Sequence, residues 1–317
     1  MLRFRLAPDN LTVHFMRLRR FSYPFSAVMS LVSVAMFLFV GLNFGIDFAG
    51  GTLFELRAKQ GAADLSSLRA LGDTLNLGEV EVQAFGGDTD VTLRIRLQPG
   101  GDVAQQASVE KVRGVIADKY EVRRVEVVGP RVSGELVQSG TLGVVLSVLA
   151  VLTYLWFRYE WPLAVSAVIA TMHDLLLTVG FFSITQLEFN TTSIAAILTI
   201  VGLSLNETVV VLDRIREMMR KYKKLPMAEI IDLSINAVLS RTIMTSTTAS
   251  LALLALVIFG GHVIRSFSLA MLWGIVVATY SSIFICSPVL IYLGVRLDGR
   301  AMSSTTDEDV VKLSPAK

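Results

Sequence analysis

The sequence predicts an α-helical membrane protein with six transmembrane helices and one small α+β domain between the first and second helices. Two observations carry this prediction. Long windows without charged side chains recur along the chain, and 53% of its 317 residues are hydrophobic. One segment of about 80 residues interrupts this pattern with alternating apolar and polar positions, as half-buried strands require.

The apolar windows are long enough to cross a membrane, which takes about 20 residues in a helix. The third window is interrupted only by His173 and Asp174, and the fourth only by Glu207. The last window contains Pro288, so it predicts either one tilted helix or a helix with a break there. The expected helices cover about 21–46, 137–157, 162–184, 190–212, 239–260 and 267–294.

Positive side chains near the helix ends predict the orientation, because Lys and Arg favour the cytoplasmic side. Residues 1–20 and the loop after the fourth helix are rich in them, whereas 186–190 has none. An even number of helices places both termini together, so 1–20 and 296–317 are expected in the cytoplasm. The first helix is followed by no A-x-A-like cleavage site, so we interpret it as a retained anchor.

The segment 47–135 is expected on the opposite, periplasmic side. Its pattern predicts the order β-α-β-β-α-β, a ferredoxin-like arrangement with two helices on one face of an antiparallel sheet. Asp64 and Asp102 are expected to cap the two helices. The second face of the sheet would then be free to bind a translocating or partner chain, although a self-contained spacer domain is the simpler alternative.

Several functions lack sequence support. The chain contains no GxxxxGK[ST], HExxH, CxxC or GxSxG pattern. A single cysteine, Cys286, excludes an intrachain disulfide, and a net charge of +2 gives no electrostatic support for nucleic-acid binding. We therefore expect no enzyme activity, no catalytic residues, no cofactor and no metal.

Four stretches together resemble one family. They are "GIDFAGGT" at 45–52, "HD" at 173–174, "GLSLNETVVVLDRIRE" at 202–217 and "SRTIMTSTT" at 240–248. In this order and placement they resemble the SecF family, membrane subunits paired with SecD beside the bacterial protein-export channel. The resemblance extends from Leu18 to Val295.

The resemblance implies half of a transporter of the resistance-nodulation-division superfamily, in the bacterial inner membrane. It implies that the chain, with SecD, uses the proton motive force to assist and complete export of unfolded proteins. The implied partners are SecD, the SecYEG channel, YajC-type accessory proteins, the exported polypeptide and membrane lipid.

Glu207 and Arg241 are the first candidate site. An ionisable side chain in hydrocarbon costs about 2.5–3.5 kcal/mol on insertion scales, so each is a functional candidate. They are expected at similar depth and can pair if their helices are adjacent. Arg241 matches the arginine of the family, whereas Asn206-Glu207 departs from its usual Asn-Asp pair by one methylene. A static buried salt bridge is the alternative to proton coupling.

Asp174 and His173 are the second candidate site. Asp174 is expected near the middle of the third helix, with Thr171 and Thr178 on the same face. It has either a proton-linked role or that of a buried acid hydrogen-bonded to these threonines. His173 is its neighbour in sequence but is expected to point elsewhere.

The signature after the first helix contains Gly45, Asp47, Gly50, Gly51 and Thr52. We interpret it as the joint between the first helix and the first strand, either a rigid link that transmits motion or a tight turn. The glycines permit backbone angles that other residues resist. Asp47 is expected to be hydrated, with no second ligand nearby for a metal.

Two further functions remain open from the sequence. One is a proton-driven half-transporter of the same superfamily that moves lipid or a small molecule. The other is a structural membrane subunit that holds partners together, for which the intramembrane charges would be dispensable.

Overall fold

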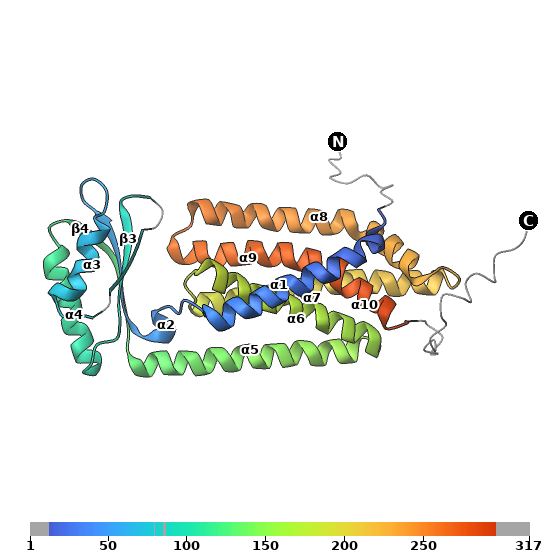
Figure 1. Cartoon of the computed structure of the whole chain (residues 1–317), viewed down its shortest axis with the longest axis horizontal. Helices are drawn as coiled ribbons and strands as arrows, with labels where there is room; N and C mark the ends of the chain where they lie inside the picture. Colours follow the sequence, from blue (N-terminus) through green and yellow to red (C-terminus); the bar gives the residue numbers. More distant parts are fainter. Residues whose placement is uncertain (1–12, 79, 85–86, 296–317) are drawn as a thin grey trace, which may run out of the picture.

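The computed structural model describes residues 13–78, 80–84 and 87–295. The expected cytoplasmic ends lie partly or wholly outside these described residues, which include neither 1–12 of the N-terminal segment nor the tail 296–317. The molecule is elongated, with a helical bundle at one end and an α+β domain at the other (Figure 1). The end of the bundle next to this domain is called the domain-proximal end below.

Within the described part of the chain, six helices are long and apolar enough to cross a membrane, in agreement with the expected fold class. They are not equally buried. In α6 (Trp161–Thr185) and the last span, Ile264–Tyr292, 56% and 61% of the most apolar window is buried, against 6% in α5 (Pro130–Arg158) and 11% in α8 (Met227–Phe259). The bundle therefore has central and peripheral helices, with α1 (Arg19–Phe39) and α7 (Thr191–Lys221) completing it.

The last span settles the alternative that the sequence left open. It continues from α9 (His262–Ser281) through a π-helical turn, Ser282–Cys286, into α10 (Ser287–Tyr292). Pro288 occupies the first turn of α10, where its missing N–H is least costly. The helix therefore passes the proline with a wide turn, of a kind that often occurs at functional sites.

The charged segment between the fourth and fifth spans differs from the expectation of a loop. Helix α7 continues to Lys221, and α8 already begins at Met227 after Pro226. Arg, Glu, Met and Lys in this segment are good helix formers. The two spans therefore extend as a helical hairpin beyond the apolar windows.

The α+β domain has the expected element order, and its sheet order is β2-β3-β1-β4 with all neighbours antiparallel. This is the ferredoxin-like arrangement. Helices α3 and α4 lie on the face of the sheet away from the bundle (Figure 1). The elements are β1 (Gly51–Ala58), α3 (Leu65–Thr74), β2 (Val80–Ala84), β3 (Asp90–Ile95), α4 (Gly101–Ile116) and β4 (Tyr120–Val128).

One of the two expected helix caps is confirmed. Asp64 caps α3, since its carboxylate accepts hydrogen bonds from the backbone N–H groups of Ser66 and Ser67, each at 3.1 Å. Hydrogen bonds from the hydroxyls of Ser66 and Ser67 hold the pKa of Asp64 well below its usual range. Asp102, in contrast, lies inside the first turn of α4, because Gly100 with φ +118° takes the cap position.

Candidate functional site

A buried carboxylate lies at the centre of the bundle. Asp174 of α6 is 1% exposed, and its Oδ2 accepts hydrogen bonds from the hydroxyls of Ser204 on α7, at 2.5 Å, and Ser281 on α9, at 2.7 Å. The second oxygen, Oδ1, lies 3.1 Å from Nδ1 of His173. Three helices therefore meet at one acid, next to the π-helical turn.

One alternative and one expectation about this acid are not met. The hydroxyls of Thr171 and Thr178 donate to the backbone carbonyls of Ala167 and Asp174, so the alternative of an acid hydrogen-bonded to these threonines is excluded in this conformation. A threonine in a helix readily donates to the carbonyl one turn earlier. His173 does not point elsewhere, because its ring turns back to its neighbour Asp174.

The tautomer of His173 follows from its surroundings. Its Nε2 is buried and has no hydrogen-bond partner among the described residues. A buried donor without an acceptor is costly, so a protonated Nε2 is disfavoured. A neutral ring that donates from Nδ1 gives Asp174 a third donor and leaves no unpaired N–H. The geometry therefore favours donation from Nδ1 of His173 to Oδ1 of Asp174.

Glu207 lies three residues after Ser204 on α7 but faces α8. Its Oε1 accepts a hydrogen bond from the hydroxyl of Thr245 at 3.2 Å. Its Oε2 is buried and has no hydrogen-bond partner in the part of the chain that the structure describes. One oxygen of this half-buried carboxylate is thus satisfied, and the other keeps room for a proton or another donor.

The expected pairing of Glu207 with Arg241 is absent from this conformation. No ion pair joins them among the described residues, and Arg241 is exposed on α8. The hydroxyl of Thr245 is also 3.0 Å from the backbone carbonyls of Arg241 and Thr242. A hydroxyl has one proton to donate, so Thr245 serves either the carboxylate or the backbone of α8, not both.

The surface formed by α7 and α8 carries polar groups at membrane depth. Asn206, Arg241, Thr245 and Thr248 are exposed on it. A guanidinium facing hydrocarbon is unfavourable by about 2.5–3.5 kcal/mol on insertion scales. This surface is therefore suited to contact with further membrane helices rather than with lipid alone.

The signature after the first helix forms a short helix and a turn. Gly45 precedes α2 (Ile46–Ala49), and Gly50 and Gly51 have φ of +71° and +121°. A Cβ on Gly51 would collide with the backbone carbonyl of Ile95 in β3. Thr52 begins the buried part of β1, where its hydroxyl accepts a hydrogen bond from Nε2 of Gln105 at 2.6 Å.

Asp47 has a partner that the sequence did not indicate. Its Oδ2 accepts hydrogen bonds from the backbone N–H and the hydroxyl of Thr191, at 2.9 and 2.6 Å. The expectation of a hydrated acid is therefore incomplete. Asp47 and Thr191 are 144 residues apart, and no local pattern reveals such a contact.

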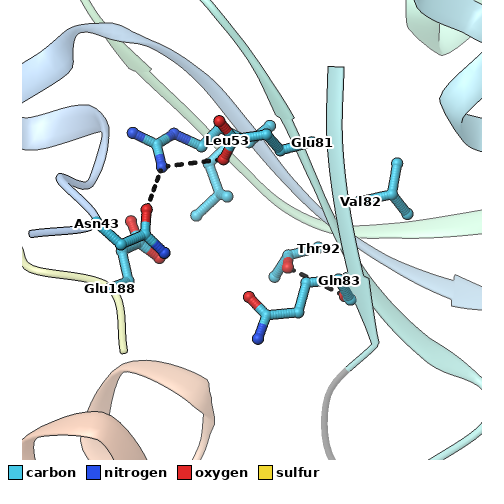
Figure 2. Close-up of a pocket in the computed structure, with 8 residues that line it drawn as sticks. Asn43, Leu53, Glu81, Val82, Gln83, Thr92 and Glu188 are labelled. Atoms are coloured by element: carbon cyan, nitrogen blue, oxygen red, sulfur yellow. Dashed lines mark hydrogen bonds and ion pairs between the residues drawn. The ribbon is translucent and has the colours of Figure 1, made fainter. Parts of the chain in front are cut away.

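A cavity of about 250 Å³ lies between the sheet and the joint. Figure 2 shows Asn43 and Glu188 on one side of it, opposite Glu81, Gln83 and Thr92 from the sheet. Its walls are mostly polar. Within the described residues, no three side chains of His, Cys, Asp or Glu gather as a metal site would require.

Six apolar helices, a ferredoxin-like domain after the first of them and ionisable side chains within the helices define a multi-pass membrane protein of the transport type. Residues 108–296 match the family model "Protein export membrane protein SecD/SecF, C-terminal", and 35–62 match "SecD/SecF GG Motif". The chain belongs to the SecD/SecF family of protein export membrane proteins.

Individual relatives agree with this assignment. Protein translocase subunit SecF of Rickettsia rickettsii is 45% identical over 293 residues, which cover 90% of this chain and 93% of that protein. Protein translocase subunit SecDF of Brucella abortus is 43% identical over 93% of this chain and 39% of its own length. The crystal structure of SecDF from Thermus thermophilus superimposes with a TM-score of 0.81 at 32% identity, over 90% of this chain and 39% of that one.

Proposed function

We propose that the chain is the SecF-type subunit of the Sec protein translocase. With SecD, it uses the proton motive force to assist and complete export of unfolded proteins across the bacterial inner membrane. The observation that carries the proposal is the half-buried carboxylate of Glu207 on a polar surface of α7 and α8, in a chain of this family. One of its oxygens has no donor among the residues that the structure describes.

The chemistry assigns each group a distinct part. Arg241 keeps its proton in proteins, so it acts as a fixed positive charge. Glu207 is the group that gains and loses the proton. When ionised it accepts a hydrogen bond from the hydroxyl of Thr245; when neutral it leaves this hydroxyl to the backbone carbonyls of Arg241 and Thr242. Each protonation thus changes how α7 contacts α8.

The available energy is sufficient for such a change. One elementary charge that crosses the membrane contributes about 2.3 kcal/mol per 100 mV. A few kcal/mol shift a two-state equilibrium by one to three orders of magnitude. A single proton per cycle therefore biases the packing of α7 substantially.

Asp174 and His173 have a different part in the proposal. Both oxygens of Asp174 already have donors, so this acid is a pre-organised charge that holds α6, α7 and α9 together. Ser204 and Glu207 are three residues apart on α7. A displacement of α7 that follows protonation of Glu207 therefore also changes the hydrogen bond from Ser204 to Asp174. Glu207 is the proton carrier and Asp174 the anchor.

The open surface of α7 and α8, and the largely exposed helix α5, fit a second set of membrane helices. The SecDF relatives are named as single chains, which supports SecD as the neighbour here. SecYEG, YajC-type proteins, the exported polypeptide and lipid complete the proposed partners. The positive charges near the helix ends support cytoplasmic termini and a periplasmic α+β domain.

An export assay with a matched control tests the function. Cells depleted of their own SecF would carry this chain, Glu207→Gln or Glu217→Gln at equal membrane levels. Glu217 is on the same helix but forms an exposed ion pair with Arg214 at 2.6 Å. Pulse-chase labelling should show unprocessed precursor accumulating at least tenfold more with Glu207→Gln than with Glu217→Gln.

The opposite result has a clear meaning. If Glu207→Gln exports like the parent chain, the carboxylate carries no proton and a structural subunit is the better description. Glu207→Asp restores the residue usual in the family, so it should export at a rate close to that of the parent.

A further inference from the structure

Two segments far apart in the sequence run side by side at the domain-proximal end of the bundle. Residues 41–47 lead from α1 into the α+β domain, and 186–191 connect α6 to α7. Phe44 and Phe189 form a parallel β-bridge between them. We call the paired segments the clasp.

The clasp is held by a ladder of hydrogen bonds. The N–H of Gly45 donates to the carbonyl of Phe189 at 2.8 Å, and the N–H of Phe189 donates to the carbonyl of Asn43 at 2.7 Å. Side chains extend the ladder, since Asn43 Nδ2 donates to the carbonyl of Gln186 at 3.0 Å and Gln186 Nε2 to the carbonyl of Gly41 at 3.3 Å. The two segments are thus joined at four successive levels.

Asp47 adds the last level at the start of α7. Its carboxylate accepts from the N–H and the hydroxyl of Thr191, the first residue of that helix. The first N–H groups of a helix have no partner within the helix, and a negative charge is favourable there. The contact therefore joins a charged group of the joint to the end of a 31-residue helix.

Close packing supports the ladder. The ring centroids of Phe44 and Phe189 are 6.0 Å apart, those of Phe48 and Phe189 5.9 Å, and those of Phe182 and Phe189 5.2 Å. Gly45 is buried in this contact, and a Cβ on it would approach the Cβ of Asn190 to 3.2 Å. The aromatic rings thus pack beside the backbone bridge of the clasp.

The α+β domain itself contacts the clasp through Arg94 of β3. Its guanidinium donates to the carbonyl of Phe44 and, at 3.4 Å, to Oδ1 of Asn43. Glu81 of β2 lies 3.4 Å from the same guanidinium. Figure 2 shows this arrangement from Asn43 to Glu81 across the cavity. The sheet therefore contacts segment 41–47 of the clasp, which in turn is hydrogen-bonded to the α6–α7 turn.

The covalent connections of the domain to α1 and α5 restrict its position less than the clasp does. Helix α1 ends at Phe39, and the next residues include Gly41 with φ +76° and no neighbouring atom near its Cβ position. Helix α5 continues directly from β4, but only 6% of its apolar window is buried against the bundle. Neither helix alone fixes the domain against the central helices.

We propose that the clasp sets the orientation of the α+β domain on the bundle and transmits displacement of α7 to that domain. Helix α7 carries Thr191 at one end of this path and Glu207 roughly 24 Å along its axis, at 1.5 Å per residue. The transmission part rests on the proposed proton-driven function, whereas the orientation part does not. Asp47 is a positioning residue, since it acts through Thr191.

Distance measurements between spin labels test the orientation. Labels at Glu110→Cys on α4 and Phe259→Cys at the end of α8 would report the domain relative to the bundle, in a Cys286→Ala background. The sample is the full chain with its partner subunit in lipid nanodiscs. The distance distribution should be narrow in the parent and in the control Asp73→Ala, an exposed acid of α3, and at least twice as wide in Asp47→Ala.

A second variant guards against a folding defect. Thr191→Val removes only the hydroxyl contact and should widen the distribution by a smaller amount. A parental width in both Asp47→Ala and Thr191→Val would overturn the proposal. Export by Asp47→Ala should be at least threefold slower than by Asp73→Ala, and a parental export rate combined with a widened distribution would overturn the transmission part.

Failure of the proposed function is distinguishable from failure of the clasp. Normal export by Glu207→Gln would contradict proton coupling, whatever the labels report. The distance distribution of Asp47→Ala tests whether the clasp sets the orientation of the domain, and this test does not depend on proton coupling.

Discussion

At the scale of single residues, the two intramembrane acids differ in how completely they are hydrogen-bonded. Asp174 has donors on both oxygens and is buried among serines from other helices. Among the described residues, Glu207 has one donor, the hydroxyl of Thr245, and one buried oxygen without a hydrogen-bond partner. A fully satisfied ion is costly to change, so the incompletely satisfied acid is the one suited to gain and lose a proton.

Thr245 is predicted to be needed for its hydroxyl rather than its size. Thr245→Val keeps the shape and removes the donor to Glu207, and hydrogen bonds to charged groups contribute about 1.5–3 kcal/mol. Export should therefore fall by about tenfold or more in the pulse-chase assay, and Thr245→Ser should restore it. The matched control is Thr248→Val, since Thr248 is exposed and donates to the carbonyl of Met244 on its own helix. Equal export by both valine variants would contradict this role.

At the scale of elements, Gly51 at the start of β1 is predicted to differ from other glycines with positive φ. Gly51→Ala adds a Cβ that collides with the carbonyl of Ile95 and separates β1 from β3 where Thr52 pairs with Ile95. Gly61→Ala is the control, because Gly61 has φ +66° but open space around it. Backbone strain alone costs about 1–3 kcal/mol and is expected in both variants. Gly51→Ala should therefore lower the melting temperature of the purified chain by more than Gly61→Ala does, because of its added collision. Equal melting temperatures would contradict this.

The α+β domain is predicted to lose stability in acid. The hydrogen bond and charge of Arg57 lower the pKa of Asp90, and the Ser66 and Ser67 hydroxyls lower that of Asp64. Because both pKa values are depressed by folding, the stabilisation is complete above the unfolded pKa of about 3.9 and disappears as pH falls through the folded values.

Hydrogen exchange of the β1 and β3 amides in the full chain measures this effect. Protection should be constant between pH 7 and 5, after correction for the intrinsic exchange rate, and fall below pH 4. Asp90→Asn should show a smaller fall than the parent. A loss of protection between pH 7 and 5 would instead require a different titrating group.

Local features of these elements were predictable from the sequence, and distant contacts were not. The cap of Asp64 depends on residues two and three positions later, and the strands of the sheet on alternation within one segment. The serines around Asp174 are 30 and 107 residues away, and the clasp joins residues 144 apart. Helix periodicity shows which face is polar but not which helix lies opposite. The sequence therefore indicates the threonines of α6 as neighbours of Asp174, and not Ser204 and Ser281.

At the scale of the whole molecule, the helical bundle has a buried centre and a surface suited to contact with further membrane helices. The exposed faces of α5 and α8 and the guanidinium of Arg241 have few contacts within the described chain. We expect the protein to be short-lived without SecD, because unpaired polar groups in the membrane are unfavourable. Its half-life in a pulse-chase experiment should be at least threefold shorter when SecD is absent, and an equal half-life would contradict an interface on this surface.

The clasp also has a consequence for the order of events during synthesis. Asp47 leaves the ribosome 144 residues before Thr191, a gap of about 7–30 s at 5–20 residues per second. The strands and helices of the α+β domain are complete long before the α6–α7 turn exists. The nascent chain therefore passes through a stage in which the complete α+β domain is attached to the membrane by α1 alone. Insertion of α7 then allows the clasp to form and to fix the domain on the bundle.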